Sequence, residues 1–144
     1  MKPTKNFTLK EFIYSKHFGR LQARVIGTFE KNKDTLIPEL QELAEQLQAL
    51  RDFLNLPVNI NISYRPKWWE LLRLRSGKSR HTLGQAADIV SDGLTPQEIK
   101  EAIEYLIENG KMKQGGIGLY NTFVHYDIGY NGKKRRWDNS TKKK

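Results

Sequence analysis

Residues 115–128 read GGIGLYNTFVHYDI, and this stretch decides the fold. Two runs rich in aromatic and aliphatic residues, 115–120 and 123–128, flank a two-residue link. This arrangement is typical of two antiparallel strands joined by a tight turn. Side chains alternate between the two faces of a strand, so we expect His125 and Asp127 to point the same way.

Two further strands are predicted upstream. Residues 58–63, VNINIS, alternate apolar and polar side chains, which is typical of a strand with one buried face. Residues 86–90, AADIV, predict a second strand. Between them, 64–80 is expected to be a long loop or a short helical excursion, and such a loop inside a small domain is usually functional or mobile.

A long helix is predicted by leucines that recur at alternating spacings of four and three. These leucines are Leu36, Leu40, Leu43, Leu47, Leu50 and Leu54. Asp34 or Thr35 is expected to cap the first turn, Pro38 is tolerated that early, and Asn55 and Pro57 close the helix. The stripe suits either a core face or a dimer seam. A domain of this size needs the helix for its core, so we expect a monomer.

A second helix is predicted to start at a capping box. Thr95 and Glu98 have the spacing of that motif, and Pro96 occupies the first helical position. Asn109-Gly110 supplies the C-terminal stop. A short helix from about Thr8 to Tyr14 is a weaker prediction.

The predicted order is helix, strand, strand, helix, strand, strand. This order favours an α+β domain with a small, largely antiparallel sheet and flanking helices, because parallel strands would need a helical crossover between each pair. The length of 144 residues suits one domain over 1–144. Its last segment, 131–144, is expected to be a basic tail.

The composition excludes several classes of protein. There is no cysteine, which excludes disulfide scaffolds, thiol catalysis and thiolate metal sites. No apolar run approaches the roughly 20 residues that span a bilayer, so membrane insertion is not expected. The first residues lack the apolar segment of a secretory signal. We therefore expect a protein that is made in the cytoplasm and needs another exit route to act outside it.

The net charge of +9 is concentrated at the C-terminus. Residues 131–144 hold seven Lys or Arg and one Asp, which places +6 in this tail. A basic tail attracts polyanions, including nucleic acid, anionic lipid and the phosphate polymers of bacterial walls. Trp137 lies next to four basic residues, a pattern that also suits nucleic acid. We favour a tail that binds wall polymers or solubilises the chain, and expect no stable nucleic-acid partner.

His81, Asp88 and His125 are candidate metal ligands. A turn at Gly84 would fold His81 back beside the strand that carries Asp88. Two imidazoles and one carboxylate suit Zn²⁺, and a fourth position left to water is typical of a catalytic site. The spacing alone fits equally a half-buried strand histidine, a loop histidine and a turn-capping aspartate.

The longer string around the first of these histidines is more specific. Residues 79–88, SRHTLGQAAD, fit Ser-x-His-x-x-Gly-x-Ala-x-Asp, and GIGLY at 116–120 precedes FVHYD at 123–127. The pattern resembles the zinc peptidases of the D-Ala-D-Ala carboxypeptidase group, which share a fold with VanX-type dipeptidases, phage L-alanyl-D-glutamate endopeptidases and the hedgehog signalling domain. The nearest branch is that of short murein peptidases ending in a His-x-Asp strand. The resemblance covers roughly 58–130 and includes SYRP at 63–66, which is similar to the family's Gly-Tyr-Arg-Ser segment.

The resemblance implies roles for the residues that match. His81, Asp88 and His125 match the three zinc ligands. Arg65 matches an arginine facing the substrate cleft, where a guanidinium binds a carboxylate or supports the negative oxygen formed during hydrolysis. The alternative for Arg65 is a surface ion pair. Ser79 matches a hydroxyl that shapes the site, and no base beside it marks it as a nucleophile.

One position departs from the pattern. Many members of the wider group place a catalytic Glu or Asp three residues before the last zinc-binding histidine, and Thr122 stands there in this chain. Asp127 is the candidate replacement, either as general base or as the carboxylate that holds a histidine by its second ring nitrogen. Tyr120 is expected to support the oxyanion or the substrate, and Trp68 to line the cleft by stacking on sugars or peptide.

The resemblance implies hydrolysis of an amide bond in the peptide stems of bacterial peptidoglycan by metal-activated water. Carboxypeptidase and endopeptidase activity both remain open. The lack of a signal sequence fits a phage lysin that reaches the wall by holin-type release or within a particle. The alternative is a cell-wall-binding module that keeps the fold without turnover, and Thr122 favours it.

Overall fold

The computed structural model of the protein describes residues 4–129 and 131–141. Its helical elements are α1 (Leu9–Ile13), the 3-10 helix η1 (Lys16–Leu21), α2 (Gln22–Leu54), α3 (Lys67–Leu72), the 3-10 helix η2 (Arg80–Leu83) and α4 (Pro96–Glu108). Its strands are β1 (Asn59–Ile62), β2 (Ala86–Val90), β3 (Gly116–Leu119), β4 (Val124–Asp127) and β5 (Arg135–Asp138). No helix among the described residues is both long and apolar enough to cross a membrane.

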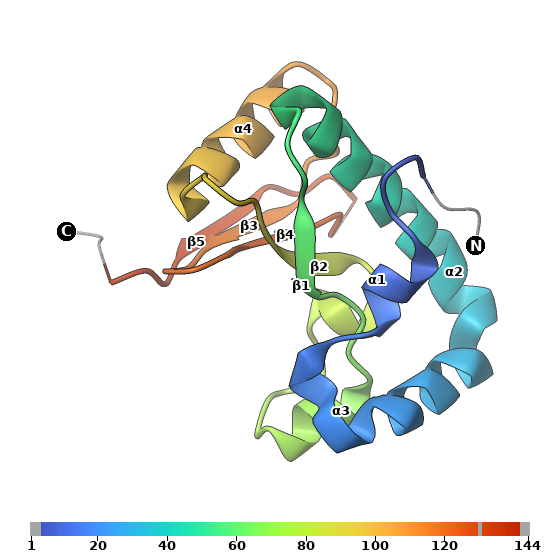
Figure 1. The fold of residues 1–144 in the computed structure, drawn as a ribbon. Coiled ribbons are helices and arrows are strands. Elements are labelled where there is room, and N and C mark those ends of the chain that lie inside the picture. The colour runs from blue at the N-terminus through green and yellow to red at the C-terminus, as the bar shows by residue number, and fades with distance from the viewer. Residues whose placement is uncertain (1–3, 130, 142–144) are drawn as a thin grey trace.

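The five strands form one sheet in the order β1-β2-β4-β3-β5. β2 pairs antiparallel with β1 and with β4, and β3 pairs antiparallel with β4. β5 pairs parallel with β3. The predicted α+β fold with a largely antiparallel sheet is therefore confirmed, and Figure 1 shows the helices gathered around it.

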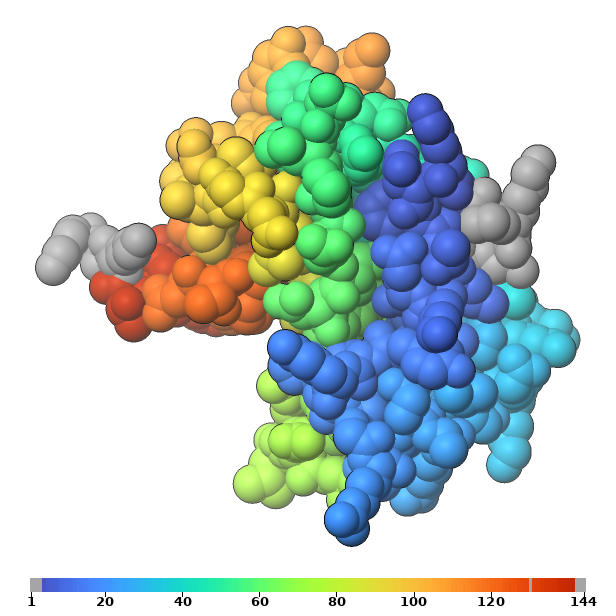
Figure 2. All heavy atoms as spheres, in the orientation of Figure 1, coloured from blue at the N-terminus to red at the C-terminus, as the bar shows by residue number. Residues whose placement is uncertain are grey.

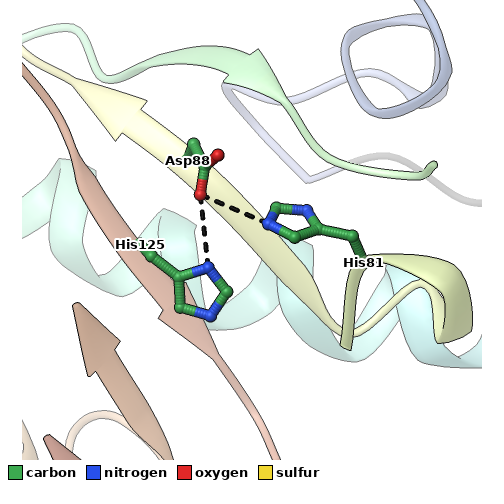
Figure 3. Close-up of side chains that lie close together, drawn as sticks. All are labelled: His81, Asp88 and His125. Carbon is green, nitrogen blue, oxygen red and sulfur yellow. Dashed lines mark hydrogen bonds and ion pairs between the residues drawn. The ribbon is translucent and has the colours of Figure 1, made fainter. Parts of the chain in front are cut away.

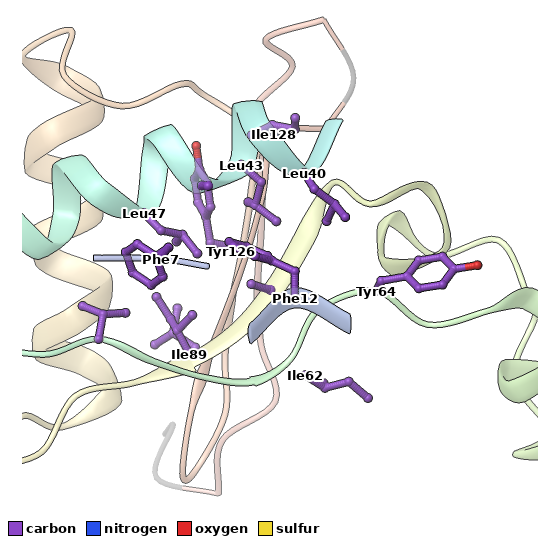
Figure 4. Packing of buried hydrophobic residues seen from close by; sticks show 14 of the residues in the cluster. Phe7, Phe12, Leu40, Leu43, Leu47, Ile62, Tyr64, Ile89, Tyr126 and Ile128 are labelled. Atoms are coloured by element: carbon purple, nitrogen blue, oxygen red, sulfur yellow. The ribbon is translucent and has the colours of Figure 1, made fainter. Parts of the chain in front are cut away.

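The core lies between the sheet and the leucine stripe of α2. Figure 4 shows side chains from α2 meeting Ile89 of β2 and Tyr126 of β4. Leu40, Leu43 and Leu47 have no exposed surface, so the stripe is a core face as predicted. The N-terminal segment also packs on this core through Phe7 and Phe12, and Figure 2 shows it against β1 and α2.

α2 is longer than the sequence predicts. It begins at Gln22, so Asp34 and Thr35 lie inside the helix and do not cap it, and Pro38 is an internal residue. The predicted start was wrong because apolar residues are sparse before Leu36. The buried Val25 and Phe29 still continue the same stripe at a spacing of four.

The other elements follow their local signals closely. The capping box of α4 is formed, with the Thr95 N–H donating to Glu98 Oε1 (2.8 Å) and the Glu98 N–H donating to Thr95 Oγ1 (3.1 Å). The helix ends at Glu108 with Asn109 as its C-cap, and Gly110 follows with a positive φ of 71°. The predicted loop 64–80 contains the short helix α3, and the weakly predicted N-terminal helix is α1.

Part of the predicted basic tail, residues 131–144, is a strand. Four of its residues form β5 at the edge of the sheet. Arg136 makes two hydrogen bonds to Glu104 on α4 (2.7 and 2.8 Å), because its fork of N–H donors matches a carboxylate. Lys133 and Lys134 are exposed, and Lys142, Lys143 and Lys144 lie outside the described residues.

We expect Phe29→Ala to destabilise the domain by about 3–5 kcal/mol, because it empties a buried site against Tyr64 that belongs to the unpredicted half of α2. Urea unfolding measures the change in the free energy of unfolding. The exposed Lys31→Ala on the same helix is the control and should change it little. Equal stabilities of the two variants would show that this half of α2 adds nothing to the core.

Candidate metal centre

Three chain segments bring two imidazoles and one carboxylate together (Figure 3). His81 comes from η2, Asp88 from β2 and His125 from β4. Asp88 and His125 are direct partners in the β2–β4 register, which sets their side chains on the same face of the sheet. All three residues are buried, and their ligand atoms lie within 4.8 Å of one another.

A left-handed turn returns His81 to the sheet. Gly84 ends η2 with φ 74° and ψ 21°, a conformation that glycine adopts without a steric cost. Two residues later the chain enters β2, so His81 lies beside Asp88 with its Nε2 3.3 Å from Asp88 Oδ1. The predicted turn at Gly84 is confirmed.

The hydrogen bonds of each imidazole decide which nitrogen faces the cluster. The Nδ1–H of His81 donates to the carbonyl oxygen of Ser63 (2.7 Å), which leaves the Nε2 lone pair facing Asp88. The Nε2–H of His125 donates to Asp127 Oδ2 (2.7 Å), and its Nδ1 lies 3.2 Å from Asp88 Oδ1. Both imidazoles therefore direct their second ring nitrogen at the same carboxylate.

The cluster fits a zinc ion. His81 Nε2 is buried and makes no hydrogen bond, which is costly for a polar atom unless a ligand uses it. Two nitrogens and one oxygen are a common zinc donor set, and three protein ligands leave a coordination position for a reactant. We expect His81 through Nε2, His125 through Nδ1 and Asp88 through its carboxylate to hold the metal.

The electrostatics of the cluster oppose protonation of its carboxylates. Burial alone would raise the pKa of Asp88, but His81 and His125 outweigh it and hold that pKa well below its usual range. Burial lowers the pKa of His81 below that of an ordinary histidine. Burial also acts to lower the pKa of His125, but the hydrogen bonds with Asp127 and Asp88 reverse this and raise it.

Asp127 is fully buried and both of its oxygens are engaged. Oδ2 accepts from His125, while Oδ1 accepts from the Gly116 N–H (3.1 Å) and from an N–H of Arg135. Burial raises the pKa of Asp127, but the hydrogen bond with His125 and the positive charges nearby lower it overall. The carboxylate is therefore placed to orient His125. Its predicted role as general base stays a prediction.

The cluster opens into a cleft of about 380 Å³. Its lining includes Arg65, Ser79 and Tyr120, so the structure brings these predicted residues together around the three ligands. Arg65 is only 6% exposed, which excludes a surface ion pair. Its Nη2 lies 3.8 Å from Asp88 Oδ2 and its Nε lies 3.5 Å from Glu70 Oε2.

Trp68 is not placed in this cleft. Its indole Nε1–H donates to Thr28 Oγ1 (2.8 Å), and the Arg24 guanidinium lies 4.3 Å from its ring centroid. Trp68 lines a separate pocket beside α2. Its neighbour Trp69 is buried and packs edge-on against Phe18. Trp69 nevertheless lines a second opening that also borders on Arg65 and Asp88, so of the two adjacent indoles only Trp68 lies away from the metal cluster.

Sequence reasoning missed several residues of this site, among them Glu70, Arg135 and Trp137. Glu70 is buried beside Arg65 and accepts a hydrogen bond from the Ser79 hydroxyl, and no motif in the sequence marks it. Arg135 and Trp137 also line the cleft, although both belong to the segment that was expected to be a tail. The sequence signal for Arg135 and Trp137 was the glycine-rich start of 115–128, because glycines on β3 leave space that large side chains can fill.

We expect His81→Ala to abolish stoichiometric zinc binding, because it removes one of three ligands. Asp127→Asn should keep the site but weaken zinc affinity by roughly 10- to 100-fold, since the partner that orients His125 is altered. Competition with a chelating dye measures both affinities. His17→Ala removes the remaining histidine, which is exposed, and should bind zinc like the parent.

Parental affinity in His81→Ala would refute the assigned ligand set. If Asp127→Asn binds zinc as tightly as the parent but hydrolyses peptide far more slowly, the general-base role of Asp127 is favoured instead.

One comparison with known proteins identifies a family. The family model for Peptidase M15 matches residues 6–127, which include all three candidate ligands and Asp127. No curated protein matches the chain. M15 peptidases are zinc metallopeptidases that act on peptidoglycan, in agreement with the donor set described above. The matched region covers most of the sequence, and this chain belongs to the M15 peptidase family.

Proposed function

We propose that this protein hydrolyses an amide bond within the peptide stems of peptidoglycan. The observation that carries the proposal is the buried His81, Asp88 and His125 cluster at the base of an open cleft whose walls are basic. Zinc held there supplies a Lewis acid that polarises a carbonyl and lowers the pKa of water. The residues around the cluster then determine which peptide binds and how it is oriented.

The charge of the cleft favours an anionic peptide. Five basic side chains line it, against two carboxylates that are already engaged; the five are Arg65, Arg75, Lys78, Arg80 and Arg135. A cleft lined by one sign of charge concentrates ligands of the opposite sign. Stem peptides carry free carboxylates, so they fit this cleft better than neutral peptides do.

Arg65 is the residue best placed to bind the reacting part of the substrate. Glu70 on one side and Asp88 on the other fix its guanidinium. A fixed planar fork of donors binds a carboxylate at two points, or supports an oxygen that becomes negative during hydrolysis. The Ser79 hydroxyl donates to Glu70, the carboxylate that holds Arg65, and so supports this arrangement.

Asp127 has a positioning role in this proposal. It accepts the His125 Nε2–H and so keeps Nδ1 directed at the cluster. Tyr120 reaches the cleft from the link between β3 and β4, where its hydroxyl oxygen accepts a hydrogen bond from Trp137. The hydroxyl proton of Tyr120 is therefore available to donate to a substrate oxygen.

The second candidate function is a wall-binding module without turnover. The observation in its favour is Thr122, which lines the opening next to Arg65 and Asp88 where the wider group carries an acid. Such a module would keep the cleft and bind stem peptides. It would release no product from peptidoglycan after zinc is added.

Mass spectrometry of products from purified peptidoglycan and a synthetic stem pentapeptide tests the main proposal. The zinc-loaded parent should release peptide fragments, and His81→Ala should release none. Arg65→Ala should lower kcat/KM by roughly 10²- to 10³-fold, because an oriented donor is lost. Arg51→Ala on α2 removes an equal charge away from the cleft and should match the parent. A parent that releases nothing while it binds the peptide would favour the module.

We further propose that the exposed Lys133 and Lys134 attract the protein to anionic wall polymers. Their binding energy should be electrostatic, so raising the salt from low to physiological concentration should weaken sedimentation with cell walls. Replacing both by Gln should reduce wall binding at low salt and flatten its dependence on salt. The pair Lys31→Gln and Lys33→Gln on α2 is the control of equal charge. Unchanged binding of the Lys133 and Lys134 variant would refute this contact.

A further inference from the structure

The C-terminal strand enters the active-site cleft from outside the region that the family model matches. β5 begins at Arg135, eight residues after the matched region ends. It pairs in parallel with β3, and this register sets Arg135 beside Gly116 and Trp137 beside Gly118. Both side chains line the cleft that contains the metal cluster.

The glycines of β3 make room for these side chains. A Cβ on Gly118 would lie 2.3 Å from the Trp137 indole, and a Cβ on Gly116 would lie 2.8 Å from the Arg135 guanidinium. Real Cβ atoms do not approach other heavy atoms that closely, so any larger residue would displace β5 side chains from the sheet surface. The side chains of β5 therefore pack directly on the two glycines of β3.

Trp137 is held against a metal ligand. Its ring centroid lies 5.0 Å from that of His125, with an interplanar angle of 48°. Its Nε1–H donates to Tyr120 Oη (3.0 Å), and the Tyr120 ring stacks on Phe123 at 4.4 Å. Together, Trp137, Tyr120 and Phe123 form the aromatic wall of the cleft.

Anchors on both sides of Trp137 fix the strand that carries it. Arg135 bonds to the buried Asp127, and Arg136 bonds to Glu104 of α4. The backbone N–H of Asn139 donates to the carbonyl of Leu119 (2.8 Å) after the strand. Since a preorganised side chain loses little freedom on binding, this wall is suited to contact a ligand directly.

We propose that Trp137 is a substrate-binding residue that packs its indole face on a small aliphatic side chain next to the scissile amide bond. The indole N–H already donates a hydrogen bond to Tyr120 Oη. The ring face that Trp137 presents to the cleft is therefore apolar. It lies beside His125, so the group it contacts is adjacent to the reacting carbonyl. The inference rests on the proposed function, in which the substrate is a stem peptide containing alanine residues.

The test compares Trp137→Ala, Trp137→Phe and Gly118→Ala on the stem pentapeptide. Trp137→Ala should raise KM by about three- to tenfold with zinc content unchanged, because an aromatic contact is lost and no ligand is. Trp137→Phe keeps an apolar ring and should lie between the parent and Trp137→Ala. Gly118→Ala should act like Trp137→Ala because its methyl group takes the space of the indole.

Two control variants separate this effect from general destabilisation. Tyr105→Ala removes an exposed aromatic ring from α4, outside the cleft, and should keep the parental KM. Gly27→Ala adds a methyl group that contacts nothing within 4 Å, so it is matched to Gly118→Ala. Circular dichroism confirms that each variant is folded before its kinetics are measured.

Replacing each alanine of the peptide by glycine identifies the contacted group. In the parent, one such replacement should raise KM, and in Trp137→Ala the same replacement should have no further effect. A parental KM in Trp137→Ala, or fully additive effects of the two changes, would overturn the proposal.

A binding measurement keeps this test separate from that of the proposed function. Indole fluorescence of the zinc-loaded protein is titrated with the pentapeptide under conditions without turnover. We expect a signal change in the parent that is lost in Trp137→Ala, although Trp68 and Trp69 remain. Equal affinity in both proteins would refute the role of Trp137 even where the parent is an active peptidase. An inactive parent that shows this difference would refute only the proposed hydrolysis.

Discussion

The register between β2 and β4 is the constraint on which the site depends. It sets Asp88 directly opposite His125, and both side chains leave the sheet on the face away from the core. A shift of one residue would turn one of them into the core, because side chains alternate along a strand. The neighbours of these two residues hold the register, since Ala87, Ile89 and Tyr126 are fully buried on the opposite face. The same apolar packing that stabilises the sheet therefore positions the metal ligands.

Burying this many charged groups requires that each one has a partner. Asp88 faces two imidazoles and Arg65, while Asp127 faces His125 and Arg135. A buried charge without such partners costs several kcal/mol in desolvation. His81 Nε2 is among the buried polar atoms of the described residues that make no hydrogen bond, and a metal ligand position explains it. Zinc should therefore stabilise the fold as well as the reaction, because it binds a site that the unfolded chain lacks.

The sequence predicts elements well where a local signal is complete. Three examples are the capping box of α4, the turn at Gly84 and the alternation of 123–128. In each, the residues that cause the local structure lie within a few positions of one another. The start of α2 could not be found in this way, because its first turns carry only Val25 and Phe29 as apolar contacts. The metal ligands were predicted as a set, since a His-x6-Asp string and a His-x-Asp strand retain their spacing in the sequence. Glu70 has no such spacing, and its role arises only when α3 packs beside Arg65.

The C-terminal strand shows the limit of composition as a guide. A run of lysines and arginines with one tryptophan predicts a solvated segment, because exposed charge is the usual state of such residues. What folds it is a set of specific partners on other elements: Asp127 and Glu104 for the arginines, and an open glycine surface on β3 for the indole. Two of the basic residues that predicted a tail, Arg135 and Arg136, therefore attach β5 to its neighbours. Asp127 accepts hydrogen bonds both from Arg135 of β5 and from the candidate metal ligand His125. A substitution in β5 can therefore alter the orientation of His125 through this one carboxylate.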